Sequence, residues 1–509
     1  MGLISSPLPA YTGTYHVGTL DVEVPVPEPG SFGTALLKAT NEPALQLDTI
    51  LCTLFYPVEP NNTNGKGRMP WMQRPIATTA QGYARFLQQK PWLIRLAMAV
   101  FARNKYLPAR IDAPLFPSTF PSTSSSADAQ SSTSESSSSS TSSKTVNPNP
   151  SSSSALPLLI FSHGLAGTRT TYSQYCGELA SRGYVVAAIE HRDGSGASTI
   201  VNLEQGKEKV VEYIQPDDLI FPPPYPILSQ IAYRREQLVM RLREIEELIK
   251  ILSRINDGEG ESVARQNRRA PSNDPSYGKQ LSEWKGRLDF GKMSVVGHSF
   301  GATTTLEVLW AGSERFKFAR GVALDPWLVP VEAQSKTGQA KLLTTTDSTS
   351  QGPSEEEQIK RSANEIKVPL LDINSEAFTM WQDQYELVRA IVENVQAPSW
   401  FMTLVGTIHP SISDVSLVFP RVVRVVGARL DGKEVMAKTV EVSEEFLGGL
   451  GKSGKWLSRE VIPGDEAGLR EGEGYFQNGG KPMEPLGDLR MHVVPKDDER
   501  KKKNNNPEV

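Results

Sequence analysis

Cysteine is nearly absent from this chain of 509 residues, which holds only Cys52 and Cys176. Two cysteines cannot build the disulfide framework that stabilises many small secreted proteins. The chain also lacks any apolar run close to the roughly 18 residues that a membrane-spanning helix needs. Its first residues show no basic stretch followed by an apolar one, as a secretory signal would. We therefore expect a cytoplasmic protein that is at most attached to a membrane surface.

The chain is also short of net charge and of clustered metal ligands. Its formal charge is −4 at pH 7, from 54 basic and 58 acidic residues. Nucleic-acid-binding proteins usually carry a basic excess, so we expect no nucleic-acid partner. The 6 histidines and 2 cysteines follow none of the spacings typical of a metal site. We therefore predict neither a metal nor another cofactor.

Large apolar side chains are scarce in several long segments. Residues 117–154 are dominated by Ser and Thr, 331–365 by Ser, Thr, Gln, Glu and Lys, and the end from 449 by Gly, Lys and Glu. Such segments cannot bury enough apolar area to offset the entropy of ordering. We predict a disordered insert at 117–154, flexible insertions near 256–288 and 331–365, and a mostly flexible tail at 449–509.

The rest of the chain, roughly 350 residues, suits one large domain. We assign 155–448 to its core and 1–116 to its N-terminal part, with strand-like alternation over 13–57 and a helix over 79–105. Buried strands are expected at 156–161, 185–189, 292–296, 321–324, 368–373 and 400–405, and helices at 172–182 and 228–255. Alternating strands and helices predict an α/β fold with a mainly parallel central sheet and helices on both faces.

Two features bear on membrane attachment. Residues 91–101 form a short, strongly apolar helix candidate, which we interpret as a core helix in preference to a patch that docks on lipid. Met1-Gly2 followed by Ser6 fits the myristoylation pattern, although Pro7 disfavours modification of Gly2. Both leave peripheral membrane contact as an open alternative.

The pentapeptide Gly297-His298-Ser299-Phe300-Gly301 carries the clearest chemistry. As a G-x-S-x-G pattern it is weak, but here it follows an apolar strand and precedes a helix. That strand–turn–helix is what a nucleophile elbow requires, because the sharp turn raises the serine above the sheet. We predict that Ser299 is a nucleophile and that the Phe300 backbone amide donates to an oxyanion.

A serine nucleophile needs a base and an acid that orients the base. In chains with this elbow the order is serine, acid, histidine. Of the two histidines downstream, His409 follows the last strand and His492 falls in the predicted tail, so His409 is the candidate base. Asp325 and Asp372 both remain candidate acids, and we favour Asp325 because it ends a strand and precedes a proline.

The second oxyanion donor should come from a loop that follows an early strand. The run Phe161-Ser162-His163-Gly164-Leu165 follows the strand at 156–161, and we predict that the Leu165 amide is this donor. His163 precedes the nucleophile in the chain, so we interpret it as structural.

Several stretches together point to one family. They are 161–193 with its end at His191-Arg192-Asp193, 297–302, 323–327, the run Ile373-Asn374-Ser375-Glu376, and His409 with Asp414 five residues on. They resemble the platelet-activating factor acetylhydrolases of the plasma and intracellular type II kind, which have an α/β-hydrolase fold. The resemblance covers most of 13–57, 156–255, 290–330 and 366–447.

The resemblance implies a triad of Ser299, Asp325 and His409, with the Leu165 and Phe300 amides as oxyanion donors. It places an aromatic residue, Trp327, in the substrate pocket. It implies a phospholipid substrate with an acetyl or a short or oxidised acyl chain at sn-2, hydrolysed without calcium. The extra segments at 117–154, 256–288 and 331–365 depart from the family and leave substrate preference in doubt. The alternatives are a broad carboxylesterase or cutinase-like hydrolase and an inactive α/β-hydrolase scaffold.

Overall fold

The computed structural model describes residues 5–59, 65–116, 155–330, 333–334, 339–340, 366–449, 454–461 and 485–495. Gly2, the insert at 117–154, most of 331–365 and most of 449–509 lie outside the described residues, so the predictions made for them stay predictions. No helix in the described ranges is long and apolar enough to cross a membrane.

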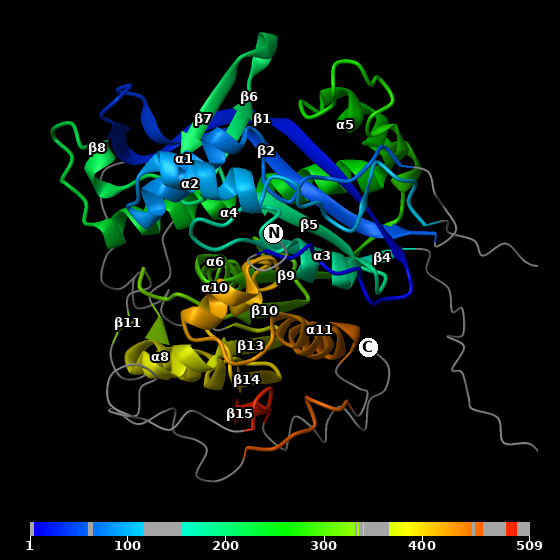
Figure 1. Cartoon of the computed structure of the whole chain (residues 1–509), viewed down its shortest axis with the longest axis vertical. Coiled ribbons are helices and arrows are strands. Elements are labelled where there is room, and N and C mark those ends of the chain that lie inside the picture. Colours follow the sequence, from blue (N-terminus) through cyan, green and yellow to red (C-terminus); the bar gives the residue numbers. More distant parts are fainter. Residues whose placement is uncertain are drawn as a thin grey trace, which may run out of the picture.

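One large sheet organises the described chain (Figure 1). Its central strands are β4 (Leu156–Ser162), β5 (Val185–Glu190), β9 (Leu288–His298), β10 (Arg320–Leu324), β13 (Leu370–Ser375) and β14 (Ser399–Leu404). These six pair in parallel, in the order β5-β4-β9-β10-β13-β14. Their side chains are almost entirely buried because helices cover both faces, as parallel sheets require.

Antiparallel strands extend both edges of this parallel centre. β2 (Pro43–Val58) pairs with β5 and with the long β1 (His16–Leu37), so the N-terminal part of the chain completes the sheet. Two short strands, β3 (Arg110–Ile111) and β8 (Leu219–Ile220), pair with β1. At the other edge β15 (Leu489–Val493) pairs with β14.

Helices lie on both faces, as predicted. α4 (Gln230–Arg254), α6 (Phe300–Trp310) and α8 (Gln382–Glu393) pack into one apolar core, and α3 (Ser173–Ala180) and α11 (Gly432–Gly448) into the other. The single-turn helices α9 (Val415–Val418) and α10 (Pro420–Val425) follow β14. The mainly parallel sheet with helices on both faces is the α/β-hydrolase fold.

The remaining short elements lie outside the parallel centre. β6 (Ser198–Asn202) and β7 (Glu208–Glu212) form a separate hairpin, and β11 (Ala333–Gln334) pairs with β12 (Gln339–Ala340). The predicted helix over 79–105 is two helices, α1 (Ile76–Leu87) and α2 (Pro91–Phe101), separated where Gln88 adopts a left-handed conformation.

Three predictions about packing differ from the structure. Residues 256–288 are not a loose insertion: they contain α5 (Gly260–Gln266), and Leu281 and Trp284 are fully buried against the core. Within the tail that was predicted to be mostly flexible, β15 adds an edge strand in which every side chain except that of Arg490 is buried. The helix at 91–101 is not a core helix, because α2 packs beside α1 and none of its residues is buried.

Candidate active site

Ser299 sits in a sharp turn between β9 and α6. Its backbone has φ 59° and ψ −122°, a strained conformation for a residue with a side chain. The flanking glycines allow this turn: a Cβ on Gly297 would lie 2.1 Å from the Gly301 carbonyl oxygen, and one on Gly301 would lie 2.0 Å from that of Ser162. The elbow geometry predicted from the sequence is therefore present, and it lifts Ser299 to the edge of the sheet.

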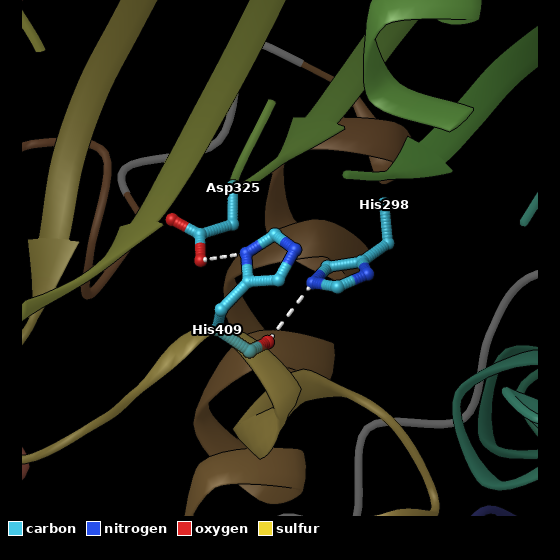
Figure 2. Close-up of side chains that lie close together, drawn as sticks. All are labelled: His298, Asp325 and His409. Atoms are coloured by element: carbon cyan, nitrogen blue, oxygen red, sulfur yellow. Dashed lines mark hydrogen bonds and ion pairs between the residues drawn. The ribbon is translucent and has the colours of Figure 1, made fainter. Parts of the chain in front are cut away.

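The structure brings Ser299, His409 and Asp325 into one hydrogen-bonded chain. His409 Nε2 lies 2.8 Å from Ser299 Oγ, and His409 Nδ1 lies 2.7 Å from Asp325 Oδ2. Figure 2 shows the second contact, with Asp325 and His409 facing each other below the strand ends. A carboxylate can only accept, so Nδ1 carries the proton and Nε2 is left to accept the serine proton.

Asp325 is fully buried and held by three donors. Besides His409, the backbone N–H and the hydroxyl of Ser375 donate to it, at 2.9 and 2.7 Å. Burial alone would raise the pKa of Asp325, but the hydrogen bond and charge of His409, with the Ser375 hydroxyl, hold that pKa below its usual value. The carboxylate is therefore ionised at neutral pH and can stabilise a positive imidazolium.

The other candidate acid, Asp372, is not in contact with His409. It lies within β13, level with Ala323 on β10, and its carboxyl oxygens have no hydrogen-bond partner among the described residues. Burial, and secondarily the charge of Asp325, raises the pKa of Asp372 well above its usual value. Asp372 thus makes no hydrogen bond in the described part of the chain through which it could orient His409.

The loop that carries Leu165 lies directly against Ser299. A Cβ on Gly164 would be 2.8 Å from Ser299 Cβ, so the two segments are at van der Waals contact. Neither the Leu165 nor the Phe300 amide donates a hydrogen bond to another described residue. Phe300 is the first residue of α6, where the amide has no partner within the helix. Both amides are free to bind a developing oxyanion.

His298, which the sequence analysis did not single out, holds the backbone of His409 in place through a hydrogen bond. Its Nε2 lies 3.1 Å from the His409 carbonyl oxygen (Figure 2). Its Nδ1 lies 2.8 Å from the Tyr172 hydroxyl. Since a carbonyl only accepts, Nε2 carries the proton. Burial, with a smaller effect of His409, lowers the pKa of His298 to about 3, so the ring stays neutral. Its place beside Ser299 in the pentapeptide was the only available signal.

Further contacts anchor the loop that carries His409. The Gly406 amide donates to Glu376 Oε2 at 2.6 Å, and Arg429 pairs with the same carboxylate at 2.8 Å. The Asp414 carboxylate accepts the Ser173 amide at 2.9 Å, at the start of α3. Two residues of the 373–376 run therefore hold this site together. Ser375 hydrogen-bonds Asp325, and Glu376 anchors the loop that carries His409.

A cavity of about 410 Å³ is lined by Ser299, Asp325 and His409. Trp327, the predicted pocket residue, lines it together with Leu165, and Phe86, Ala377, Phe378 and Trp381 complete a mostly apolar wall. The sequence analysis missed the last four because they come from α1 and from the turn after β13. Only the folded chain brings those segments together.

One group of possible metal ligands occurs in the described part of the chain: His298, Asp325 and His409. Both ring nitrogens of His409 already contact Ser299 and Asp325, and His298 faces Tyr172 and a carbonyl oxygen. These contacts leave no convergent set of free lone pairs, so the group does not fit a metal site.

Comparison with known proteins identifies relatives of this chain. The family model described as platelet-activating factor acetylhydrolase, isoform II, matches residues 129–360 and 353–453. Platelet-activating factor acetylhydrolases of Canis lupus familiaris and Gallus gallus are 33% and 28% identical, over 35% and 52% of this chain. These matches span 36% and 53% of the two relatives.

Two more proteins resemble the chain over most of its length. A Schizosaccharomyces pombe protein, provisionally described as a phospholipase A2, is 26% identical over 86% of this chain and 91% of that protein. Among solved structures, a ferulic acid esterase from Streptomyces cinnamoneus covers 90% of this chain and 97% of its own, with a TM-score of 0.48 and 15% identity. The matched family model covers more than half of the residues, and the chain belongs to the platelet-activating factor acetylhydrolase isoform II family.

Proposed function

We propose that this protein is a calcium-independent serine esterase that hydrolyses the sn-2 acetyl, or short or oxidised acyl, ester of phospholipids such as 1-alkyl-2-acetylglycerophosphocholine. One observation carries the proposal: the Ser299–His409–Asp325 hydrogen-bonded chain opens into an apolar cavity, in a member of this family. The cavity of about 410 Å³ is at the small end of ligand pockets, which supports a short acyl group.

The proposed reaction runs through an acyl-enzyme. His409 Nε2 takes the Ser299 proton as Oγ attacks the sn-2 ester carbonyl carbon, and Asp325 stabilises the imidazolium. The Leu165 and Phe300 amides hold the oxyanion. The tetrahedral intermediate collapses, and the lysophospholipid leaves with the proton from His409. A water then gives a proton to His409 as its oxygen attacks the acyl carbon. The bond between that carbon and Ser299 Oγ breaks, His409 returns the proton to Oγ, and the acid is released.

The test compares wild type with Ser299→Ala on phosphatidylcholines whose sn-2 chain runs from two to sixteen carbons. We expect a loss of about 10⁵–10⁶ in kcat, because removing the nucleophile abolishes the acyl-enzyme. The matched control is Ser313→Ala, at an exposed serine just after α6, which should keep full activity. A steep fall with chain length is expected, since the cavity is small.

The two alternative functions, a broad carboxylesterase and an inactive scaffold, predict different results when simple esters and a fluorophosphonate are added to this comparison. Equal rates on simple esters and on phospholipids would support a broad carboxylesterase and contradict the phospholipid substrate. Failure of a fluorophosphonate to label wild type would support an inactive scaffold and contradict the whole proposal. Labelling of wild type and of Ser313→Ala, but not of Ser299→Ala, is the result we expect.

We also propose that α2 contacts a phospholipid surface. Its Trp92, Leu93, Leu96 and Val100 are 64%, 44%, 56% and 45% exposed. The neighbouring α1 adds Phe86, which also lines the cavity. Such an apolar helix, with Lys90 and Arg95 nearby, is suited to lie in the membrane interface. Contact there would present lipid to the mouth of the site.

Sedimentation with phosphatidylcholine vesicles containing a fifth anionic lipid tests this contact. Replacing both Trp92 and Leu96 by Glu should weaken vesicle binding at least tenfold, because about 25 cal/mol is lost per Å² of apolar area no longer buried. Neither residue lines the cavity, so hydrolysis of a soluble ester should not change. Unchanged vesicle binding would contradict the role of α2.

A further inference from the structure

An arginine of α4, Arg241, is fully buried behind the nucleophile. Its Nε lies 2.8 Å from Asp193 Oδ2, and its Nη2 donates to Ser195 Oγ at 2.6 Å. Asp193 has no exposed surface either, so the ion pair is held away from water. Burying an arginine is unfavourable unless its charge is paired and its N–H groups are hydrogen-bonded. The remaining contacts of the Arg241 guanidinium indicate its role.

The first of these contacts is to the loop of the upstream oxyanion donor. Arg241 Nη1 donates to the His163 carbonyl oxygen at 3.0 Å. The next carbonyl, that of Gly164, lies 2.9 Å from His163 Nδ1. The His191 amide donates to His163 Nε2 at 3.2 Å, so Nδ1 carries the proton and donates to Gly164. Arg241 therefore fixes the peptide immediately before the one that presents the Leu165 amide.

The second contact is to the residue of the other oxyanion donor. The Arg241 guanidinium lies 4.3 Å from the centre of the Phe300 ring, within cation–π range. Arg241 Nη1 also donates to Thr304 Oγ1 at 3.2 Å, and that hydroxyl donates to the Phe300 carbonyl oxygen at 2.9 Å. One side chain thus touches both segments that supply an oxyanion amide.

We propose that Arg241 is a positioning residue that holds the Leu165 and Phe300 amides at the spacing needed to bind one oxyanion. Its planar fork reaches the loop after β4 and the first turn of α6 together, which the single ammonium of a lysine cannot do. Asp193 and Ser195 fix the orientation of the fork. The proposal rests on the proposed function, because it assumes serine-ester chemistry at Ser299, but it is independent of the phospholipid substrate.

The test uses Arg241→Lys, which keeps the charge and removes the fork. The matched control is Arg234→Lys: Arg234 lies on the same helix, is 1% exposed, and bonds Gln237 and Tyr213 instead of the oxyanion segments. Near-ultraviolet circular dichroism and thermal unfolding establish that both variants fold. The soluble substrate p-nitrophenyl acetate avoids any effect of lipid binding.

A positioning role changes the rate of the chemical step and leaves ground-state binding unaltered. We expect Arg241→Lys to lower kcat by about 10–100-fold, less than the 10²–10³ that follows loss of a whole oxyanion donor, with KM within about twofold. Arg234→Lys should keep kcat within about twofold.

The inhibition constant of an aryl trifluoromethyl ketone distinguishes a positioning role from a merely structural one, which would leave that constant unchanged. Ser299 Oγ adds to its carbonyl carbon, the serine proton passes to His409, and the former carbonyl oxygen becomes the bound oxyanion. Its inhibition constant should rise in Arg241→Lys by the same factor by which kcat falls. The affinity for the matching alcohol, which cannot form the adduct, should not change.

Two results would overturn the positioning role: a folded Arg241→Lys with wild-type kcat, or an equal loss of kcat in Arg234→Lys. If Arg241→Lys does not fold, Thr304→Val replaces it, and a kcat unchanged from wild type in that variant overturns the role as well. We expect a three- to tenfold fall there. A wild type that neither hydrolyses p-nitrophenyl acetate nor binds the ketone overturns the proposed function itself, and the positioning role with it.

Discussion

Replacing the carboxylate of Asp325 by an amide should reverse the proton pattern of His409. Three donors point at this carboxylate: His409 Nδ1, the Ser375 amide and the Ser375 hydroxyl. In Asp325→Asn the amide oxygen must keep the Ser375 N–H, because a backbone amide cannot become an acceptor. The new NH₂ then faces His409 Nδ1, which must accept, so the proton moves to Nε2. In that tautomer the imidazole cannot take the serine proton.

The size of the effect follows from this tautomer change. Loss of the correct tautomer at unchanged geometry costs about 10⁴ in kcat in serine hydrolases, which corresponds to about 5.5 kcal/mol in the activation free energy. Asp372→Asn is the matched control on the neighbouring strand. Burial raises the pKa of its carboxyl and so favours the neutral form, and the carboxyl oxygens have no hydrogen-bond partner among the described residues, so exchange for a neutral amide of the same shape should leave kcat within about threefold.

The assay measures kcat for p-nitrophenyl acetate and the rate of fluorophosphonate labelling, with thermal unfolding as the control for folding. Both activities should fall together in Asp325→Asn and stay unchanged in Asp372→Asn. If Asp372→Asn were the inactive variant and Asp325→Asn kept more than a tenth of the activity, the assignment of the orienting acid would be wrong.

Two further predictions concern acid stability and the oxyanion loop. Burial lowers the pKa values of His298 and His492 to about 3, below the unfolded value near 6.5, so the unfolded state takes up protons first as the pH falls. Each histidine therefore contributes its full share to the free energy of unfolding above pH 6.5, and that share is lost as the pH falls. Between pH 7.5 and 5.5, urea unfolding should show a loss of about 1.3 kcal/mol for each histidine. A free energy of unfolding that does not change over this range would contradict the prediction. Gly164→Ala places a Cβ 2.8 Å from Ser299 Cβ and should slow fluorophosphonate labelling about 100-fold, whereas Gly30→Ala, with nothing within 4 Å, should label normally.

The central fold, and the grouping of Ser299, His409 and Asp325 in one hydrogen-bonded chain, were predictable from the sequence. Short apolar runs identified each parallel strand, and the order serine, acid, histidine then limited the choice of partners. Without the family resemblance the choice between Asp325 and Asp372 stayed open, because the sequence does not give strand register. In the structure Ala323 pairs with Asp372, so Asp372 lies inside the sheet, while Asp325 follows the last paired residue, Leu324, and projects past the edge.

The positions of α2 and β15 depend on contacts between distant segments, which the local sequence pattern does not predict. α2 is apolar all along, which suggested a core helix, but its place beside α1 leaves it on the surface. His492 was assigned to a loose tail, yet β15 buries it against Thr403, to which its Nε2 lies 2.8 Å away. The alternation of Leu489, Met491 and Val493 was a signal for that strand, hidden among polar neighbours.

Three of the seven non-glycine residues with a positive φ angle in the described part of the chain lie at the edge of the sheet where the reaction is proposed to occur. Ser299 follows β9, Asp325 follows β10 and Ala166 lies in the loop after β4, and these residues have positive φ angles of 59°, 51° and 54°. Each such conformation costs on the order of 1–2 kcal/mol in a residue with a side chain. All three are buried, and the neighbours that surround them hold the unfavourable angles in place. These angles turn the chain sharply at the strand ends and direct Ser299, Asp325 and the loop that carries Leu165 toward one point, as the proposed reaction requires.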